Sequence, residues 1–321
     1  MDRRRLAGVL LVVVSAIAFG SGALFAKPVY GVGLDWLTLL VWRFGIGAAL
    51  AWGWLLASPA RRAALRATPR RQALAALGLG AVYTLNSSTY FAALETVPAS
   101  LASLIVYIYP VLVAVLTLRF GRPLAGRGPW IALGIATIGA VLAVGGVDAG
   151  HLPPLSGIAL AVASPIIYSG WIVLSARLGG ERRDRAGDDA HGGAGAAVAS
   201  ALMMTSTGVI FLGLAVVTAH PIAPAAIPSG AWPGLVGIGL VSTFIAIQTF
   251  YGGARRIGAA QAALISTIEP AYTITMAAIL FGERLTPVQL VGGALIIGAV
   301  VLAQSTGRSS EHGTGLRLAD E

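Results

Sequence analysis

The sequence contains no cysteine and few charged residues. Disulfides, thiolate metal sites and cysteine nucleophiles are therefore excluded. Only 11% of the 321 residues are charged, whereas soluble domains carry about 25%. All four histidines fall in predicted loops or in the tail, and no aspartate lies within an apolar run. Hydrolysis inside a membrane requires such groups at depth, and ATPases require a P-loop, which is also missing. The sequence predicts neither an enzyme nor a bound metal or cofactor.

What the sequence has in abundance is apolar residues, which make up 56% of the chain. They form runs of about 18 to 23 residues, the length that an α-helix needs to cross a hydrocarbon core of about 30 Å. The sequence predicts an all-α integral membrane protein with ten transmembrane helices. The expected spans are Leu6–Ala26, Leu37–Ala57, Ala73–Leu94, Ser100–Phe120, Trp130–Val147, Leu155–Ala176, Ala196–Thr218, Gly234–Ala254, Ala259–Phe281 and Val288–Gln304.

Most of the positive charge lies on one side of these spans. Nineteen of the 22 basic residues fall in one set of tails and loops, Lys27 and Arg284 lie on the other side, and Arg43 lies within a span. By the positive-inside rule, both termini should face the cytoplasm from a plasma (inner) membrane. The net charge of +9 is then topological and does not indicate nucleic-acid binding. The basic start of the chain and its first apolar run are interpreted as a retained span.

The two halves of the chain are related in sequence. A shift of 160 positions aligns Ser88–Leu112 with Gln248–Tyr272, placing Pro110 opposite Pro270. Five spans is an odd number, so the second repeat should be inverted relative to the first, as in many secondary transporters with a substrate site between the repeats. We expect repeats at 6–147 and 155–304, with a flexible cytoplasmic linker at 177–195. A disordered cytoplasmic tail is expected at 305–321.

Two stretches resemble a known family. Ala18–Leu50 is similar to the first two spans of an EamA-type repeat, and Ile265–Ala303 combines a glutamate-proline pair, a glycine-glutamate-arginine turn and a glycine-rich last span at that family's spacing. The resemblance covers Leu6 to Gln304. It implies a member of the drug/metabolite transporter superfamily, which is a ten-helix bundle that usually exports amino acids or other small metabolites by alternating access without ATP. The second half lacks a counterpart of Arg43.

Glu269 is the strongest candidate for transport chemistry. An ionised side chain at the centre of a span costs about 2.5–3.5 kcal/mol, so it usually faces the bundle interior with a partner or water. Ser266 and Thr273 share its helical face and form a polar stripe. Two interpretations remain open: a structural carboxylate that caps backbone groups or pairs with arginine, and a site for a proton or a substrate ammonium group. The second would couple transport to protons or bind the small-molecule substrate.

Two basic residues near one end of the spans are further candidates. Arg43 is either an anchor that reaches outward to the membrane interface or a group at the rim of the cavity, where it would meet a substrate carboxylate or Glu269. Lys27, which precedes Pro28, is either an interfacial lysine or part of the outer mouth of the substrate path. The resemblance to the first span of an EamA-type repeat favours the mouth for Lys27.

Polar and aromatic residues of three other spans complete the candidate substrate site. Each has an alternative role in packing between helices, because buried amides and hydroxyl groups need partners that any neighbouring helix can supply. The candidates on the third, sixth and eighth spans are Tyr83, Asn86, Ser87, Tyr90, Tyr168, Trp171, Ser175 and Gln248.

The prolines and small residues of the spans are interpreted as architecture. Pro110 and Pro270 should each bend or loosen a span near the membrane midplane, as hinges. Tyr109 stands opposite Glu269 in the repeat, so the acid is not required by this element. Small residues four apart, such as Gly45 with Ala49 and Ala294 with Gly298, should let helices approach closely, and those of the last span are candidates for a homodimer face.

The sequence therefore favours a secondary transporter that exports small amphipathic metabolites, amino acids first among them. An uptake permease or a nucleotide-sugar exchanger of the same superfamily is the nearest alternative, although an anionic nucleotide would require more basic groups than Arg43 in the cavity. A membrane scaffold or receptor without transport is the alternative from another class. It does not account for an inverted repeat with Glu269 near the midplane.

Overall fold

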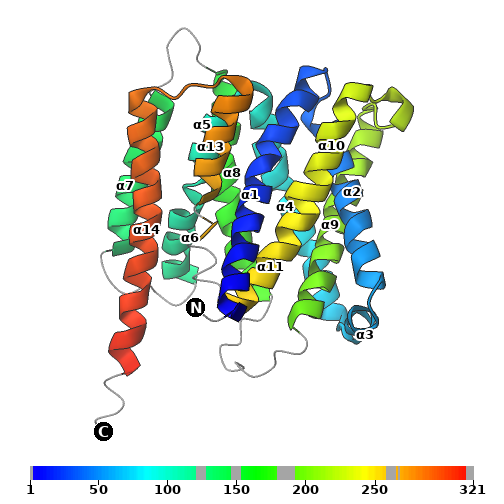
Figure 1. Cartoon of the computed structure of the whole chain (residues 1–321), viewed down its shortest axis with the longest axis horizontal. Helices are drawn as coiled ribbons and strands as arrows, with labels where there is room; N and C mark the ends of the chain where they lie inside the picture. Colours follow the sequence, from blue (N-terminus) through cyan, green and yellow to red (C-terminus); the bar gives the residue numbers. More distant parts are fainter. Residues whose placement is uncertain are drawn as a thin grey trace.

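The computed structural model describes residues 3–120, 128–145, 153–178, 192–257, 265–266 and 268–315. Within these residues the chain is helical and contains no strand. The long helices are α1 (Arg3–Gly31), α2 (Trp36–Leu56), α4 (Arg70–Thr96), α7 (Gly128–Gly145), α8 (Leu155–Leu178), α9 (Gly192–Val217) and α14 (Pro287–Gly315). They stand side by side as a bundle, and α1 begins at the same end of the bundle at which α14 ends (Figure 1).

Five helical stretches of the described residues are long and apolar enough to cross a membrane. They are Leu6–Gly31, Trp36–Leu56, Leu155–Leu174, Gly195–Val217 and Ser229–Gly253. Shorter apolar stretches lie at Ala99–Val113, Trp130–Gly139, Ile268–Phe281 and Pro287–Ala299. The predicted third span falls in α4, which carries the polar run TLNSST at 84–89. The multi-pass helical class is confirmed, and the count of ten spans is not.

Two predicted spans are not continuous α-helices. The fourth consists of α5 (Ala99–Val106) and α6 (Tyr109–Phe120), which are separated by a turn at Tyr107 and Ile108, just before Pro110. The eighth consists of α10 (Trp232–Gly239), a π-helical segment η4 (Leu240–Ile245) and α11 (Ala246–Ile257). It is preceded by the 3₁₀ turns η2 (Pro224–Ala226) and η3 (Ser229–Ala231). Part of the ninth predicted span, 259–264 and 267, lies outside the described residues, and its last part is α13 (Ile268–Phe281).

Other segments differ from the predicted boundaries. The basic stretch between the second and third predicted spans contains a short amphipathic helix, α3 (Pro59–Ala67). The last helix, α14, continues to Gly315, past the predicted end of the tenth span at Gln304. Most of the predicted linker at 177–195 lies outside the described residues, which end at 178 and resume at 192.

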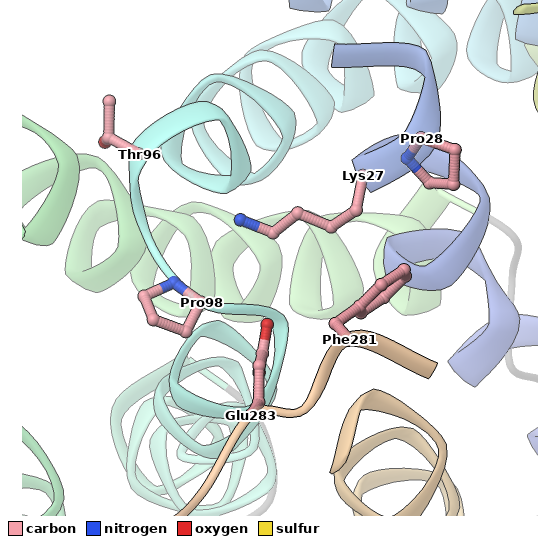
Figure 2. A pocket seen from close by; sticks show the side chains of 6 residues that line it. All are labelled: Lys27, Pro28, Thr96, Pro98, Phe281 and Glu283. Atoms are coloured by element: carbon pink, nitrogen blue, oxygen red, sulfur yellow. The ribbon is translucent and has the colours of Figure 1, made fainter. Parts of the chain in front are cut away.

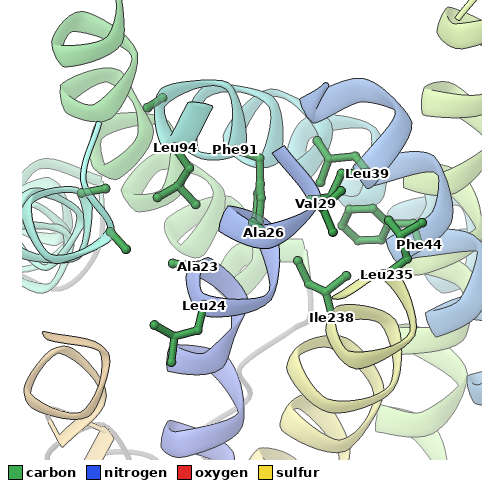
Figure 3. Packing of buried hydrophobic residues seen from close by; sticks show 14 of the residues in the cluster. Ala23, Leu24, Ala26, Val29, Leu39, Phe44, Phe91, Leu94, Leu235 and Ile238 are labelled. Atoms are coloured by element: carbon green, nitrogen blue, oxygen red, sulfur yellow. The ribbon is translucent and has the colours of Figure 1, made fainter. Parts of the chain in front are cut away.

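Helix α1 lies at the centre of the largest apolar core. Figure 3 shows side chains of α1, including Ala26 and Val29, among those of α2, α4 and α10. Phe91 of α4 and Phe44 of α2 are almost fully buried in this cluster. The core therefore joins helices of both repeats, because α10 belongs to the second half of the chain.

Small residues bring some of these helices together, but not the pairs expected from the sequence. A methyl group at Gly139 of α7 would stand 2.7 Å from the Gly292 carbonyl oxygen of α14, so these helices depend on glycine for their close approach. By contrast, a methyl group at Gly45 or Gly298 would meet no atom of the described residues within 4 Å. The interpretation of Gly45 as a packing position inside the chain is wrong. The surface at Gly298 stays available to lipid or to a second copy of the chain.

Candidate functional site

Glu269 lies in the first turn of α13 and faces tyrosines. The Tyr107 hydroxyl, at the break between α5 and α6, makes a long hydrogen bond of 3.4 Å to Glu269 Oε2 and a second bond to the Ser266 carbonyl. A residue of the first repeat thus contacts the acid of the second. Within the described residues, no basic side chain forms an ion pair with Glu269. Three other tyrosines lie near enough to interact electrostatically with its carboxylate: Tyr90, Tyr109 and Tyr168.

Aromatic rings form a continuous series that begins beside Glu269. Tyr107 and Tyr109 meet edge to face, with ring centroids 5.7 Å apart, and Tyr109 meets Tyr168 at 4.8 Å. Tyr168 stacks on Trp171 at 5.8 Å, and Trp171 lies 5.2 Å from Tyr83. Tyr83 meets Phe44, the residue after Arg43, at 6.1 Å. Tyr107 lies at the break between α5 and α6, and the other residues of the series come from α2, α4, α6 and α8. The sequence had grouped Tyr83, Tyr168 and Trp171 by helical face alone.

Arg43 lies at the far end of this aromatic series and is buried. Its side chain is only 6% exposed, and its Nε donates a hydrogen bond of 2.9 Å to Thr243 Oγ1. The guanidinium carbon lies 4.6 Å from the centre of the Phe91 ring and 5.1 Å from that of Phe44. The interpretation of Arg43 as an outward-reaching anchor is therefore wrong. A direct contact with Glu269 is not observed either.

The π-helical segment η4 explains how Thr243 reaches Arg43. Thr243 Oγ1 donates to the carbonyl of Ile238, five residues earlier, at 2.9 Å, which is the spacing of a π-helical turn. The same oxygen accepts the hydrogen bond from Arg43. A methyl group at Gly47 would stand 2.7 Å from Thr243 Cγ2, so glycine at this position lets α2 approach η4. The widened turn thus supplies a polar group inside an otherwise apolar contact.

Among the buried polar side chains without a hydrogen-bond partner in the part of the chain that the structure describes are two serines of α4 and η4. Ser87 lies on α4 between Tyr83 and Tyr90, and Ser242 precedes Thr243 in η4. Both residues are at most 2% exposed. An unpaired buried hydroxyl group carries an energetic cost, which a polar ligand or water would remove.

Several predicted site residues form hydrogen bonds between helices instead. Asn86 accepts from Ser164 (3.0 Å), Trp171 Nε1 donates to the Leu79 carbonyl (2.8 Å), Gln248 donates to Ser200 (3.3 Å), and Thr273 donates to the Gly20 carbonyl (3.0 Å). The predicted polar stripe of α13 therefore divides, with Thr273 against α1 and Glu269 toward the tyrosines. The side chain of Ser175 lies outside the described set.

Lys27 lines a pocket at the end of the bundle where α1 ends. The pocket has a volume of about 390 Å³ and is lined by Lys27, Pro28, Thr96, Pro98, Phe281 and Glu283 (Figure 2). The ammonium group of Lys27 donates a hydrogen bond of 2.6 Å to the Val97 carbonyl, at the end of α4. Lys27 is therefore bonded within the protein and is not a freely extended interfacial side chain.

Glu283 holds the same turn from the other repeat. Its carboxylate accepts hydrogen bonds from the backbone N–H groups of Ala99 and Ser100, both at 2.9 Å, and from the Ser100 hydroxyl at 2.6 Å. These N–H groups open α5, where a negative charge is favourable. Gly282, with φ of 66°, provides the left-handed turn that precedes Glu283. The turn between α4 and α5 is thus clamped by Lys27 of the first repeat and Glu283 of the second.

Sequence reasoning did not select Tyr107, Tyr109, Thr243 or Glu283 as site residues. Tyr109 was visible as the repeat counterpart of Glu269, and Glu283 belongs to the glycine-glutamate-arginine turn that carried the family resemblance. Tyr107 lies within an apolar run, and Thr243 is 200 residues from Arg43 in the chain. Neither has a local signal in the sequence.

Comparisons with known proteins agree with the repeat structure. The EamA-like transporter family matches residues 6–145 and again 155–304. A protein of Bacillus subtilis (strain 168) described as an uncharacterized transporter, YcbK, is 27% identical over 301 residues, which is 90% of each chain. An uncharacterized transporter of Archaeoglobus fulgidus is 27% identical over 300 residues, covering 92% of this chain and 96% of its own.

One solved crystal structure shares the fold. It superposes with a TM-score of 0.62 at 19% sequence identity, over 96% of this chain and 99% of that chain. At this level of identity the likeness concerns the arrangement of the helices alone.

Proposed function

Because the chain belongs to the EamA-like transporter family, which its two matched repeats show, we propose that it is a secondary transporter for small amphipathic metabolites, with amino acids as the first candidates. It exports them across the plasma (inner) membrane by alternating access. The proposed protein is a carrier and not an enzyme, and it uses no ATP.

The observation that carries this proposal is the pair of opposite charges inside the bundle. Glu269 contacts a tyrosine and Arg43 contacts a threonine and aromatic rings, and neither has an ion-pair partner among the described residues. Charged groups within a membrane bundle usually pair with one another or mark a substrate path. A zwitterion would supply both missing charges, meeting Glu269 with its ammonium group and Arg43 with its carboxylate at successive points of its path.

The aromatic series between the two charges supports an amphipathic substrate. Tyr109, Tyr168 and Tyr83 offer ring faces and hydroxyl groups along the path from Glu269 to Arg43. Aromatic faces attract ammonium groups and pack well against apolar side chains. Nucleotide sugars fit less well, because Arg43 is the one basic residue in this series and a diphosphate would require several.

The clamp on the turn between α4 and α5 supports a gate at one end of the path. Lys27 and Glu283 close the end of the bundle where α1 ends, and α5 leads from the clamped turn to the break before Pro110, where Tyr107 contacts Glu269. In the proposed cycle, these bonds hold the outer side closed, and their release opens it. The arginine distribution supports cytoplasmic termini, which reporter fusions at each terminus would test.

Counterflow into liposomes tests the proposal directly. Purified protein is reconstituted with a panel of unlabelled amino acids and amines inside, and uptake of the corresponding labelled compound is measured. We expect counterflow for at least one zwitterionic amphipathic compound. Its absence for every compound, with protein correctly inserted, would favour a scaffold or receptor without transport. Imposed pH gradients then show whether Glu269 exchanges protons for substrate.

A further inference from the structure

Helix α3 and the start of α4 form the most basic surface of the described chain. Arg61, Arg62 and Arg66 lie on α3, and Arg70 and Arg71 open α4. No acidic residue occurs in the sequence between Asp35 and Glu95. Four of these arginines are exposed to solvent, and Arg61 is partly buried. Within the described residues, none of the five forms an ion pair with a carboxylate.

The orientation of α3 places this charge at the edge of the bundle. Figure 1 shows α3 almost end-on, beside the lower ends of α2 and α9, whereas the long helices run from top to bottom. Its axis therefore lies across theirs, in the direction of the membrane surface. Ala64 and Leu65 of α3 pack against the apolar core, while Arg62 and Arg66 are exposed. This is the division of faces found in helices that lie in a membrane interface.

Trp54 at the end of α2 lies next to this basic helix. The Trp54 side chain is 46% exposed near the end of α2, a position typical of interfacial tryptophans. The Arg61 guanidinium lies 3.9 Å from the centre of the Trp54 ring, and its Nε donates to the Trp54 carbonyl at 2.8 Å. Arg61 is thus bound within the protein against an exposed tryptophan at the end of α2, and Arg62 and Arg66 follow it on the same short helix.

We propose that Arg62, Arg66, Arg70 and Arg71 bind the phosphate groups of anionic phospholipids. Guanidinium groups bind phosphate oxygens in a bidentate manner, and clusters of arginine beside a transmembrane helix attract anionic lipid. The lipid head groups lie along α3 and the first turn of α4. It neutralises a surface that has no acidic partner in this part of the protein, and it fixes the connection between α2 and α4 at the membrane.

Lipid binding can be measured without any transport. Purified protein is incubated with phosphatidylglycerol or phosphatidylcholine, and bound lipids are counted by native mass spectrometry. We expect preferential retention of phosphatidylglycerol, reduced about tenfold in the variant R62Q/R66Q/R70Q. The control R3Q/R256Q/R284Q removes the same charge from exposed positions elsewhere. It should retain the lipid within about twofold of the parent.

Three results would overturn the proposal. One is equal retention of the two lipids by the parent protein. Another is an equal loss in both triple variants, which would show a general effect of net charge. The third is displacement of the lipid by inorganic phosphate at millimolar concentration, which would identify a free-anion site. The variant R62K/R66K/R70K retains the positive charges without the forked guanidinium groups, so its retention of phosphatidylglycerol should fall but stay above that of phosphatidylcholine. This variant tests the site even if the glutamine variant misfolds. Because transport is not measured, failure of the proposed function would leave this result unaffected.

Discussion

The two repeats use equivalent prolines in the same structural role, but with different neighbours. Pro110 is the second residue of α6, and Pro270 is the third residue of α13. Proline is tolerated in the first turn of a helix, where its missing N–H would have no partner. Tyr109 precedes one proline and Glu269 precedes the other. The shared feature is thus a helix start inside the membrane region, and the charge is a separate addition to the second repeat.

The two segments also meet one another. Tyr107 lies just before the start of α6. Its hydroxyl bonds to the Ser266 carbonyl, which lies just before α13, and to Glu269 in the first turn of α13. Elements that are equivalent by repeat therefore face each other where the two halves join. Residues that the two repeats share, such as the prolines, thus indicate the common structure, whereas a position at which they differ, such as Glu269, indicates the specific function.

Replacing Glu269 by glutamine should have the largest effect. Glutamine keeps the shape of the side chain and can accept the Tyr107 hydrogen bond. It removes the negative charge that we propose binds the ammonium group of the substrate. Loss of one partner of a buried charged pair costs about 2–5 kcal/mol, so we expect a fall of about 100-fold in counterflow at low substrate concentration. The matched control is Glu95→Gln, which changes a carboxylate that binds the Trp36 N–H. Equal flux in both variants would remove Glu269 from the mechanism.

Arg43 provides the next test, because the second repeat has no counterpart for it. Arg43→Gln should lower counterflow of a zwitterion about 10- to 30-fold, through the loss of its carboxylate contact. A substrate analogue that lacks the carboxylate should be transported equally by the parent and the variant. KM and the maximal rate are measured for both compounds with the parent and with the variant, in liposomes of the same composition. If both compounds lose transport equally, Arg43 acts through its bond to Thr243 and not through the substrate.

The surroundings of these two charges show what sequence alone can and cannot provide. The helical class, the two repeats and the positions of Glu269 and Arg43 follow from composition and alignment, because an unfavourable residue in an apolar run is visible locally. The partner of Arg43 cannot be recognised from the sequence, because Thr243 lies 200 residues later in a π-helical turn. Asn86 and Gln248 had the right chemistry for a substrate site, but other helices satisfy them. Helix packing decides between such alternatives, and it depends on the whole bundle.

The clamp at the turn between α4 and α5 should contribute to stability. Glu283→Gln retains one acceptor oxygen in place of two, so at least one of the three bonds to Ala99 and Ser100 is lost. We expect the free energy of unfolding to fall by about 1–2 kcal/mol. Thermal unfolding in detergent measures this against Arg284→Gln, which changes the neighbouring exposed residue. Equal melting temperatures for the parent and Glu283→Gln would contradict the clamp.

The contact between the two helix starts is tested by Tyr107→Phe. The change removes the hydroxyl that donates to the Ser266 carbonyl and to Glu269, and it leaves the ring contact with Tyr109. A net loss of about 1 kcal/mol is expected for such bonds, which lowers the melting temperature by about 1–2 °C in a protein of this size. Tyr251→Phe serves as the control, because the structure shows no hydrogen bond from its hydroxyl within the described residues. A larger loss in the control would contradict the assigned role of Tyr107.

The smallest effects are expected from the prolines, and they test the comparison itself. If both prolines occupy first turns, Pro110→Ala and Pro270→Ala disturb no hydrogen bond of the helix interior, and each changes the free energy of unfolding by less than about 1 kcal/mol. A proline in a helix interior would instead give clear stabilisation on replacement, since it costs about 3 kcal/mol there. Thermal unfolding and counterflow are measured for both variants. If Pro270→Ala abolished transport while Pro110→Ala did not, Pro270 would contribute to the chemistry beside Glu269. The conclusion that both prolines have only a structural role, and that Glu269 alone carries the function, would then be wrong.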